Sequence, residues 1–287
     1  MPQTINTNLV SLNAQRNVST SQASLSTAMQ RLSSGLRVNS AKDDAAGLAI
    51  AERMHTQVRG MNVAMRNAND GISMAQVGEG ALGKVSDMLQ RMRELAVQAA
   101  NGTNSTTDRD SLNNEYLELA RESARTLGGT QFNGQNILAT TTNGVFQVGA
   151  NTSATLDQIS IAGFDWTLAA TITTAVGAAV ATDPTTVISG TDGSFALAAI
   201  GAIDGAINAI NSQRATFGAV QNRFDNVVAN LMVATENQSA ARSRIMDADY
   251  AMETSNLSRA QILQQAGNAM VAQANQLPQQ VLSLLKG

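Results

Sequence analysis

The chain has no cysteine and a single histidine, His55, among its 287 residues. The missing cysteine excludes a disulfide framework and thiolate chemistry, and one histidine excludes nearly every histidine-based metal site or catalytic triad. Aromatic residues make up only 3% of the chain, and all of them lie between Tyr116 and Tyr250. Because large aromatic side chains dominate compact cores, we expect such a core only in the middle, with thin helix-on-helix layers at both ends.

Positive charge is also scarce: the chain has 19 Lys and Arg residues and 22 Asp and Glu residues, which gives a net charge of -3. A nucleic-acid partner would need a basic patch, so we expect none. The first residues show neither the basic nor the apolar region of a secretory signal peptide, and no stretch reaches the roughly 20 apolar residues that span a bilayer. We therefore expect no membrane partner, and export would need a dedicated machine.

Charge is missing altogether between Gln261 and Leu285. Apolar or small residues recur there at three- and four-residue spacing, at Leu263, Gly267, Met270, Ala274, Leu277, Val281 and Leu284. This is a heptad seam whose flanks carry Gln, Asn, Ser and Ala instead of the Glu and Lys of an exposed coiled coil. Such a helix is suited to being surrounded by other helices, and Pro278 predicts a kink or a restart within it.

The N-terminal segment has the same character, because Arg16 is the only charged residue before Arg31. The three- and four-residue spacing is repeated by Ile5, Leu9 and Leu12, and then by Leu25, Met29, Leu32 and Leu36. An isolated helix of this kind is marginal in water, because nucleation is unfavourable and an exposed apolar stripe gains nothing. The two ends together predict an assembly seam through which copies of the chain associate.

The middle of the chain alternates helical and turn signals. Ser40 and Asp43 fit a capping box before a helix, Asn69-Asp70-Gly71 predicts a break, and a second seam runs from Leu82 to Ala99. Ser111–Leu127 is predicted to be a helix with Tyr116 inside and Glu118 and Arg125 outside.

Glycine-containing turns near residues 132–150 predict a β-hairpin. The predicted fold class is mainly α, with long antiparallel helices, coiled-coil-like pairing of the termini and this small β-hairpin region in the middle.

Four long stretches carry a family resemblance: RLSSGLRVNSAKDDAAGLAIAERM, RNANDGISMAQVGEGAL, RMRELAVQAANGTNS and the C-terminal SRIMDADYAMETSNLSRAQILQQAGNAMVAQANQLPQQVLSLL. They resemble bacterial flagellin over roughly residues 1–150 and 200–287, whereas residues 160–200 carry no recognisable resemblance. Several long motifs in the right order make the resemblance specific. It implies a structural subunit that assembles into the flagellar filament for swimming motility; the alternative is the hook-filament junction protein.

The resemblance also implies a domain map. Residues 1–44 and 243–287 would form the inner helical domain of the filament core, residues 45–160 and 200–242 the outer helical domain, and residues 161–199 a short variable surface insertion. The implied partners are other copies of the chain, an export chaperone at the C-terminal helix, and the cap and hook-junction proteins. Export through the flagellar type III apparatus implies a secreted, extracellular protein in the flagellum.

Some flagellins stimulate a host Toll-like receptor, and the matching patch here would be Arg91, Leu95 and Glu115. Leu95 is expected on the flank of the seam, because Leu89 and Met92 already occupy it. The same two charged residues also fit a simple role as solvated or subunit-contact charges.

No catalytic constellation is visible, so we expect no enzyme, no cofactor and no metal. Gly78, Gly80 and Gly83 satisfy the dinucleotide-binding spacing, but the preceding residues are helical and no βαβ unit surrounds them, which favours a helix junction. Asp247, Asp249 and Glu253 lack a histidine, and nearby arginines favour ion pairs along the helix face. An enzyme or an unrelated binding module is the least supported function.

Overall fold

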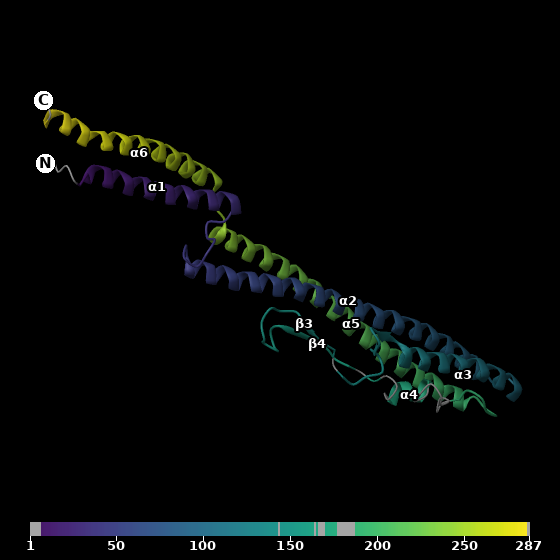
Figure 1. The fold of residues 1–287 in the computed structure, drawn as a ribbon. Helices are drawn as coiled ribbons and strands as arrows, with labels where there is room; N and C mark the ends of the chain where they lie inside the picture. Colours follow the sequence, from purple (N-terminus) through teal and green to yellow (C-terminus); the bar gives the residue numbers. More distant parts are fainter. Residues whose placement is uncertain (1–6, 143, 164, 166–169, 177–186, 286–287) are drawn as a thin grey trace. The chain divides into compact units, whose positions relative to one another are not determined.

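A computed structural model describes residues 7–142, 144–163, 165, 170–176 and 187–285, with the side chains of 170, 171, 176 and 277–285 left aside (Figure 1). The chain divides into two compact units. The terminal unit contains residues 1–57 and 236–287, and the central unit contains residues 58–235. Two long helices, α2 (Ala45–Ala99) and α5 (Ser194–Met246), contribute to both units.

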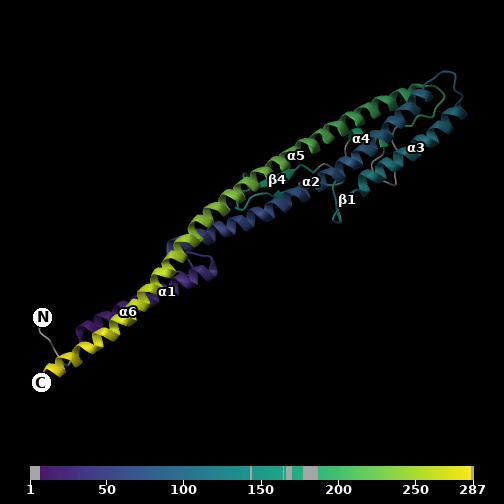
Figure 2. The ribbon, with the colours of Figure 1, turned by 90° about the horizontal axis from the view of Figure 1, so that it is seen from above.

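The terminal unit is built on two antiparallel helices, α1 (Leu9–Ser34) and α6 (Tyr250–Leu285), which lie side by side in both views (Figures 1 and 2). At one end Asn8 caps α1 and donates from Nδ2 to the carbonyl of Ala274 at 2.7 Å. At the other end the hydroxyl of Tyr250 donates to the carbonyl of Leu32 at 3.2 Å. The predicted terminal pairing is therefore confirmed. The backbone of α6 remains helical through Pro278, so the predicted restart there is wrong.

The segment that follows α1 and the segment between α5 and α6 are joined by short backbone hydrogen bonds. Gly35 ends α1 with a φ of 70°, a conformation that glycine adopts without strain, and its carbonyl accepts from Ala248 N at 2.9 Å. A small apolar cluster of Val38, Ala51 and Met246 lies beneath them. The expected capping box does not start the helix: the N-cap is Asp44, four residues after Ser40, and its carboxylate accepts from the N–H of Gly47 at 2.7 Å. Ser40 and Asp43 form the preceding turn.

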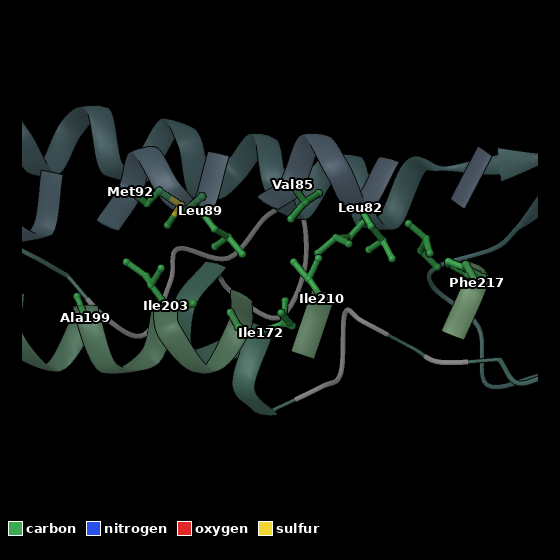
Figure 3. Packing of buried hydrophobic residues seen from close by; sticks show 14 of the residues in the cluster. Leu82, Val85, Leu89, Met92, Ile172, Ala199, Ile203, Ile210 and Phe217 are labelled. Atoms are coloured by element: carbon green, nitrogen blue, oxygen red, sulfur yellow. The ribbon is translucent and has the colours of Figure 1, made fainter. Parts of the chain in front are cut away.

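The core of the central unit lies between α2, α5 and α3 (Thr106–Gly129). In Figure 3, Leu82, Val85, Leu89 and Met92 of α2 point toward Ala199, Ile203 and Ile210 of α5. All of these side chains are fully buried. The three-and-four spacing predicted for the second seam is therefore confirmed, and the only large aromatic side chains in this core, as far as the structure describes it, are Tyr116, Phe146, Phe217 and Phe224.

No break interrupts α2 at Asn69-Asp70-Gly71, contrary to the prediction from the turn motif. A Cβ atom on Gly71 would lie 2.7 Å from the ring of Phe224, and one on Gly78 would lie 3.1 Å from the ring of Phe217. These glycines therefore sit where α5 places an aromatic ring against α2. Local turn propensity loses to tertiary packing here.

The small β-region contains two antiparallel pairs. Strands β1 (Gln131–Phe132) and β2 (Gln135–Asn136) are joined by a turn in which Asn133 and Gly134 have φ values of 50° and 78°. Both positive φ values fit the type I′ turn that an Asn-Gly pair favours. Strands β3 (Gly144–Gln147) and β4 (Gln158–Ile161) form the second pair.

The stretch between β4 and α5 is only partly a surface segment. Its short helix α4 (Ala170–Val176) packs on α3, and Ile172, Ala175 and Ile188 are fully buried in the central core. These residues belong to the core, so the expectation of a surface insertion over 161–199 is wrong for them. Their small number within a Thr- and Ala-rich sequence explains why the pattern missed them.

Candidate assembly surface

The contact between α1 and α6 follows a regular heptad pattern. Buried and half-buried residues of α1 recur at alternating three- and four-residue steps: Ser11, Ala14, Val18, Ser21, Leu25, Ala28 and Leu32. The facing residues of α6 are Glu253, Asn256, Ala260, Gln264, Gly267, Val271 and Ala274. Most of these side chains are small, so the two helices approach closely.

Polar contacts fix the register of this pair. The hydroxyl of Ser11 donates to Oδ1 of Asn275 at 2.7 Å, next to the Asn8 cap. Near the opposite end, Arg31 and Glu253 form a partly buried ion pair at 3.8 Å. Because partners are specified at both ends, a slip of the helices by one turn would leave these groups unpaired.

Large apolar side chains of the same helices remain at the surface. Leu263 is 51% exposed and Met270 is 60% exposed, while Leu9 and Leu12 of α1 are 67% and 51% exposed. Others of this kind are Val10, Met29, Met252 and Ile262. On α6, Met252, Leu263 and Met270 share one side of the helix, whereas the four residues of α1 lie on different sides. We call the eight residues together the exposed stripe; none of them is buried in the α1–α6 contact.

The predicted seam thus spans two different surfaces. Leu25, Leu32 and Ala274 lie in the α1–α6 contact, with Ala274 only 3% exposed. Leu9, Leu12, Leu263 and Met270 belong to the exposed stripe. Ile5 and the side chains of Leu277, Val281 and Leu284 lie outside the described residues. Ser11, Val18 and Ala260 were not predicted to be part of the seam, and the side chains of Ser11 and Ala260 carry only a weak apolar signal.

An open groove borders the exposed stripe. Small polar side chains of α1, including Thr20, Ser24 and Thr27, form one wall, and Arg259 and Leu263 of α6 form the other. The Ser and Thr hydroxyls of this wall donate to carbonyls four residues earlier in α1, as Ser24 does to Thr20 at 3.1 Å. The donor capacity of these hydroxyls is therefore used within the helix. Charged and amide side chains also line the groove: Asn17, Arg31, Glu253, Asn256 and Arg259.

The residues proposed as a receptor patch do not form one surface. Arg91 donates to Glu94 at 2.9 Å and to Glu115 at 3.0 Å, and these hydrogen bonds raise the pKa of Arg91. Both Arg91 and Glu115 are about half exposed at the side chain. Leu95, in contrast, is 1% exposed and lies in the central core, so it does not form an exposed patch with Arg91 and Glu115.

The acidic residues near α6 serve as caps and ion-pair partners. Oδ1 of Asp249 accepts from the N–H of Ala251 at 2.9 Å at the start of α6, and Asp247 accepts from the hydroxyl of Ser243. Glu253 pairs with Arg31 and not with the neighbouring arginines that the sequence suggested. Among the described residues, no group of three or more potential metal ligands comes together.

One helix in the described part of the chain, α5, contains a window that is long and apolar enough to cross a membrane by length and composition alone. Core helices of many proteins pass the same test. Its residues Ile203 and Ile210 face α2 in the central core (Figure 3), and 28% of the apolar window is buried within the structure. The absence of a membrane partner stays a prediction.

Comparisons with known proteins agree with this architecture. The family described as "Bacterial flagellin N-terminal helical region" matches residues 5–143, and "Bacterial flagellin C-terminal helical region" matches residues 200–285. The flagellin of Halalkalibacterium halodurans is 47% identical over 283 residues, covering 98% of this chain and 99% of that protein. The flagellar filament 33 kDa core protein of Treponema phagedenis is 43% identical over 286 residues, with the same shares covered.

A crystal structure of Bacillus cereus flagellin is 37% identical, covers 58% of this chain and 88% of that chain, and has a TM-score of 0.49. The two family regions together match well over half of the residues, on both sides of the unmatched stretch 144–199. With these matches, the paired terminal helices and the charge-free C-terminal seam, the chain belongs to the bacterial flagellin family.

Proposed function

We propose that this chain is the structural subunit that self-assembles into the bacterial flagellar filament for swimming motility. The single observation that carries the proposal is the exposed stripe beside the α1–α6 contact. A protein that works as a monomer gains nothing from leucine and methionine side chains that are half or more exposed along a paired helix. A filament subunit buries them against its neighbours.

The physical gain from this burial is repeated along the filament. Each half-exposed leucine or methionine contributes on the order of 1 kcal/mol when it leaves water. Several such residues on α1 and α6, multiplied over the many copies in a polymer, offset the entropy lost on association. The groove lined by Thr20, Ser24 and Leu263 gives a neighbouring helix a place to lie against this stripe.

The domain map follows from the same assignment. Residues 1–44 and 243–287 form the inner helical domain in this proposal, and residues 45–160 and 200–242 form the outer helical domain. The two compact units support a two-domain subunit, although their boundaries lie within α2 and α5, between 57 and 58 and between 235 and 236. In this proposal the inner domain supplies the assembly surface and the outer domain stiffens the subunit.

Export and accessory partners are the next step of the proposal. The protein would leave the cell through the flagellar type III apparatus and function outside it, with cap and hook-junction proteins at the filament's ends. An apolar stripe on α6 that is uncovered before assembly needs protection during transit. An export chaperone bound to the C-terminal helix meets this need, because it would cover Leu263 and Met270.

A host Toll-like receptor could contact the exposed pair Arg91 and Glu115, but Leu95 would act only by supporting the helix beneath them. We propose no enzymatic activity, because the charged side chains described above serve as caps, ion pairs and a backbone contact. Bacterial flagellins are structural proteins, which agrees with this assignment.

Electron microscopy of the purified protein with filament seeds tests the function directly. Long helical polymers are expected. Short stubs that stop growing would instead fit a hook-filament junction protein, and a monomer that never elongates seeds would contradict the proposal.

A further inference from the structure

Three polar side chains lie in a row on the buried face of α3. Arg109, Asn113 and Tyr116 are spaced by four and three residues, so they share one side of the helix. Their exposed fractions are 4%, 9% and 0%. Burying three polar groups is unfavourable unless each is hydrogen-bonded, so their partners show what this face is built to hold.

Among the described residues, all of their hydrogen-bond partners are main-chain groups. In addition to hydrogen bonds from Ser194, the charge of Arg109 helps to lower the pKa of the neighbouring Asp192 carboxyl. Arg109 donates from Nη1 to the carbonyls of Gly190 and Thr191 at 3.4 and 3.0 Å, and from Nε and Nη2 to the carbonyls of Ala99 and Asn101 at 3.0 and 3.2 Å. Its guanidinium therefore joins the end of α2 to the stretch that precedes α5. The planar fork of arginine suits this role, because its donors point in several fixed directions.

The other two side chains bind the same stretch further along. Oδ1 of Asn113 accepts from the backbone N–H of Ile188 at 3.0 Å. The hydroxyl of Tyr116 donates to the carbonyl of Ala175 at 3.3 Å, and burial raises the pKa of Tyr116, so the hydroxyl stays protonated. The chain is thus held at two points, near Ala175 and over 188–191.

We propose that Arg109, Asn113 and Tyr116 form a binding site on α3 for the main chain at Ala175 and over 188–191, one that holds these two points through backbone groups. Backbone carbonyls are the same in every residue, and backbone N–H groups in every residue except proline. The site therefore fixes the chain at these two points without requiring particular side chains there. Among the described residues, Ile172, Ala175 and Ile188 add apolar anchors beside it.

The extent of the family regions supports a binding site that does not depend on the sequence it binds. Arg109, Asn113 and Tyr116 lie inside the matched N-terminal region, 5–143, whereas the stretch they bind lies outside both matched regions. The stretch 161–199 has no Lys or Arg and is rich in Thr, Ala, Gly and Ser, so it has few side chains of its own to hold it. A site that binds main chain replaces the packing that this composition cannot provide.

Substitutions on the two sides of the contact test the proposal in the full-length monomer. Arg109→Lys keeps the charge but loses the fork, and Tyr116→Phe loses only the hydroxyl. We expect Arg109→Lys to lower the melting temperature by about 5 °C or more and Tyr116→Phe by about 2–4 °C. Thr191→Ala removes an exposed side chain but keeps the backbone carbonyl that Arg109 binds. The melting temperature of this variant should therefore stay within about 1 °C of that of the parent.

Hydrogen exchange at Ile188 gives a local measurement that does not depend on global unfolding. Asn113→Leu removes the acceptor, and exchange of the Ile188 amide should become at least about tenfold faster, because one charge-neutral hydrogen bond of this strength protects the amide by that order. An unchanged exchange rate at Ile188 in a folded Asn113→Leu chain would overturn the proposal.

Insertions provide the second arm. The first variant has twelve Gly and Ser residues inserted between Ala181 and Thr182, a position between the two holding points in the sequence. Lengthening the connection between two fixed points costs little free energy, so the melting temperature should fall by less than about 2 °C. The same insertion between Ser189 and Gly190 separates residues that the site holds together and should cost as much as Arg109→Lys. Equal effects of the two insertions, or a loss from Thr191→Ala as large as that from Arg109→Lys, would overturn the proposal. Because both arms use the monomer, a failure of the filament function would not affect them.

Discussion

Cγ2 of Val18 lies 2.5 Å from the position that a Cβ atom on Gly267 would occupy, so α1 and α6 meet closely only because residue 267 is a glycine. Ala28 and Ala260 are similarly buried in the same contact. The terminal pair is thus held by small side chains at short distance, and its large apolar side chains are left for other contacts. Pairing within the subunit and assembly between subunits use different residues of the same two helices.

The first prediction follows from this glycine. Gly267→Val should push α1 and α6 apart, because its Cβ would overlap Val18, and overpacking of this kind costs about 1–3 kcal/mol. The expected result is faster proteolysis of both ends and weaker polymerisation, with the central unit unaffected. Limited proteolysis and a thermal melt measure this. Ala266→Val, on the neighbouring exposed position, is the control; equal effects of the two changes would show that the close approach does not matter.

The central unit offers a matched pair of glycines. Gly71→Ala should destabilise the chain by about 1–3 kcal/mol, because its Cβ would meet the ring of Phe224 at 2.7 Å. Gly80→Ala has no heavy atom within 4 Å and should stabilise the same helix by about 0.5–1 kcal/mol. Denaturant unfolding of both variants checks the pair. Changes of the same sign would contradict the packing described for α2 and α5.

Acid sensitivity should arise in part at the start of α3. The hydroxyl and N–H of Ser105 donate to Asp108, and these hydrogen bonds hold the pKa of that carboxyl below its ordinary value. The unfolded chain has the ordinary value of about 4. The stabilising effect is therefore present above about pH 4 and is lost as the pH falls through the lower folded pKa.

Comparison of the parent with Asp108→Asn isolates this contribution. The parent should melt at a higher temperature at neutral pH, and the difference should shrink toward zero near pH 2. Melting curves across this pH range test it. A difference that is constant with pH would mean that the carboxyl of Asp108 does not stabilise the helix start.

Substitutions at Arg91 and Leu95 distinguish a residue that a receptor would contact from one that only supports the helix. Arg91→Ala should change the free energy of unfolding by less than about 1 kcal/mol, because the Arg91–Glu115 pair is exposed to solvent. Leu95→Ala should cost about 2–5 kcal/mol by leaving a cavity in the core. If a Toll-like receptor contacts this surface, a cell reporter should respond less to Arg91→Ala at unchanged stability. A normal response would remove the patch from the proposal.

Sequence analysis found the helices with regular apolar spacing and missed what depends on tertiary partners. The seam from Leu82 to Ala99 was recognisable because its large apolar side chains repeat. Gly71 looked like a turn, since no local signal shows that Phe224 lies against it. Likewise, Leu95 lies beside a run of apolar residues that already includes Met92, and its burial in the central core depends on tertiary packing that no local signal shows.

The same limit applies to the assembly surface. Heptad spacing identified the helices, but it merged the α1–α6 contact with the exposed stripe, because Ala274 and Met270 are one helical turn apart and both fit the pattern. The side of a helix that faces a partner in the same chain depends on the partner's side chains. The small residues Ser11 and Val18 carry this information, and they are visible only once the two helices are placed together.

The most direct test of the central claim is a side-by-side seeded polymerisation of Leu263→Asp and Gln265→Asp. Both residues are exposed in the monomer, but only Leu263 belongs to the exposed stripe. A carboxylate at 263 would be buried in every subunit contact, and its desolvation would cost several kcal/mol even beside Arg259 on the same wall of the groove, while the monomer would tolerate it. We predict that Leu263→Asp melts like the parent and fails to elongate seeds, whereas Gln265→Asp elongates them with at most a mild defect. Normal filament growth by Leu263→Asp would contradict the account.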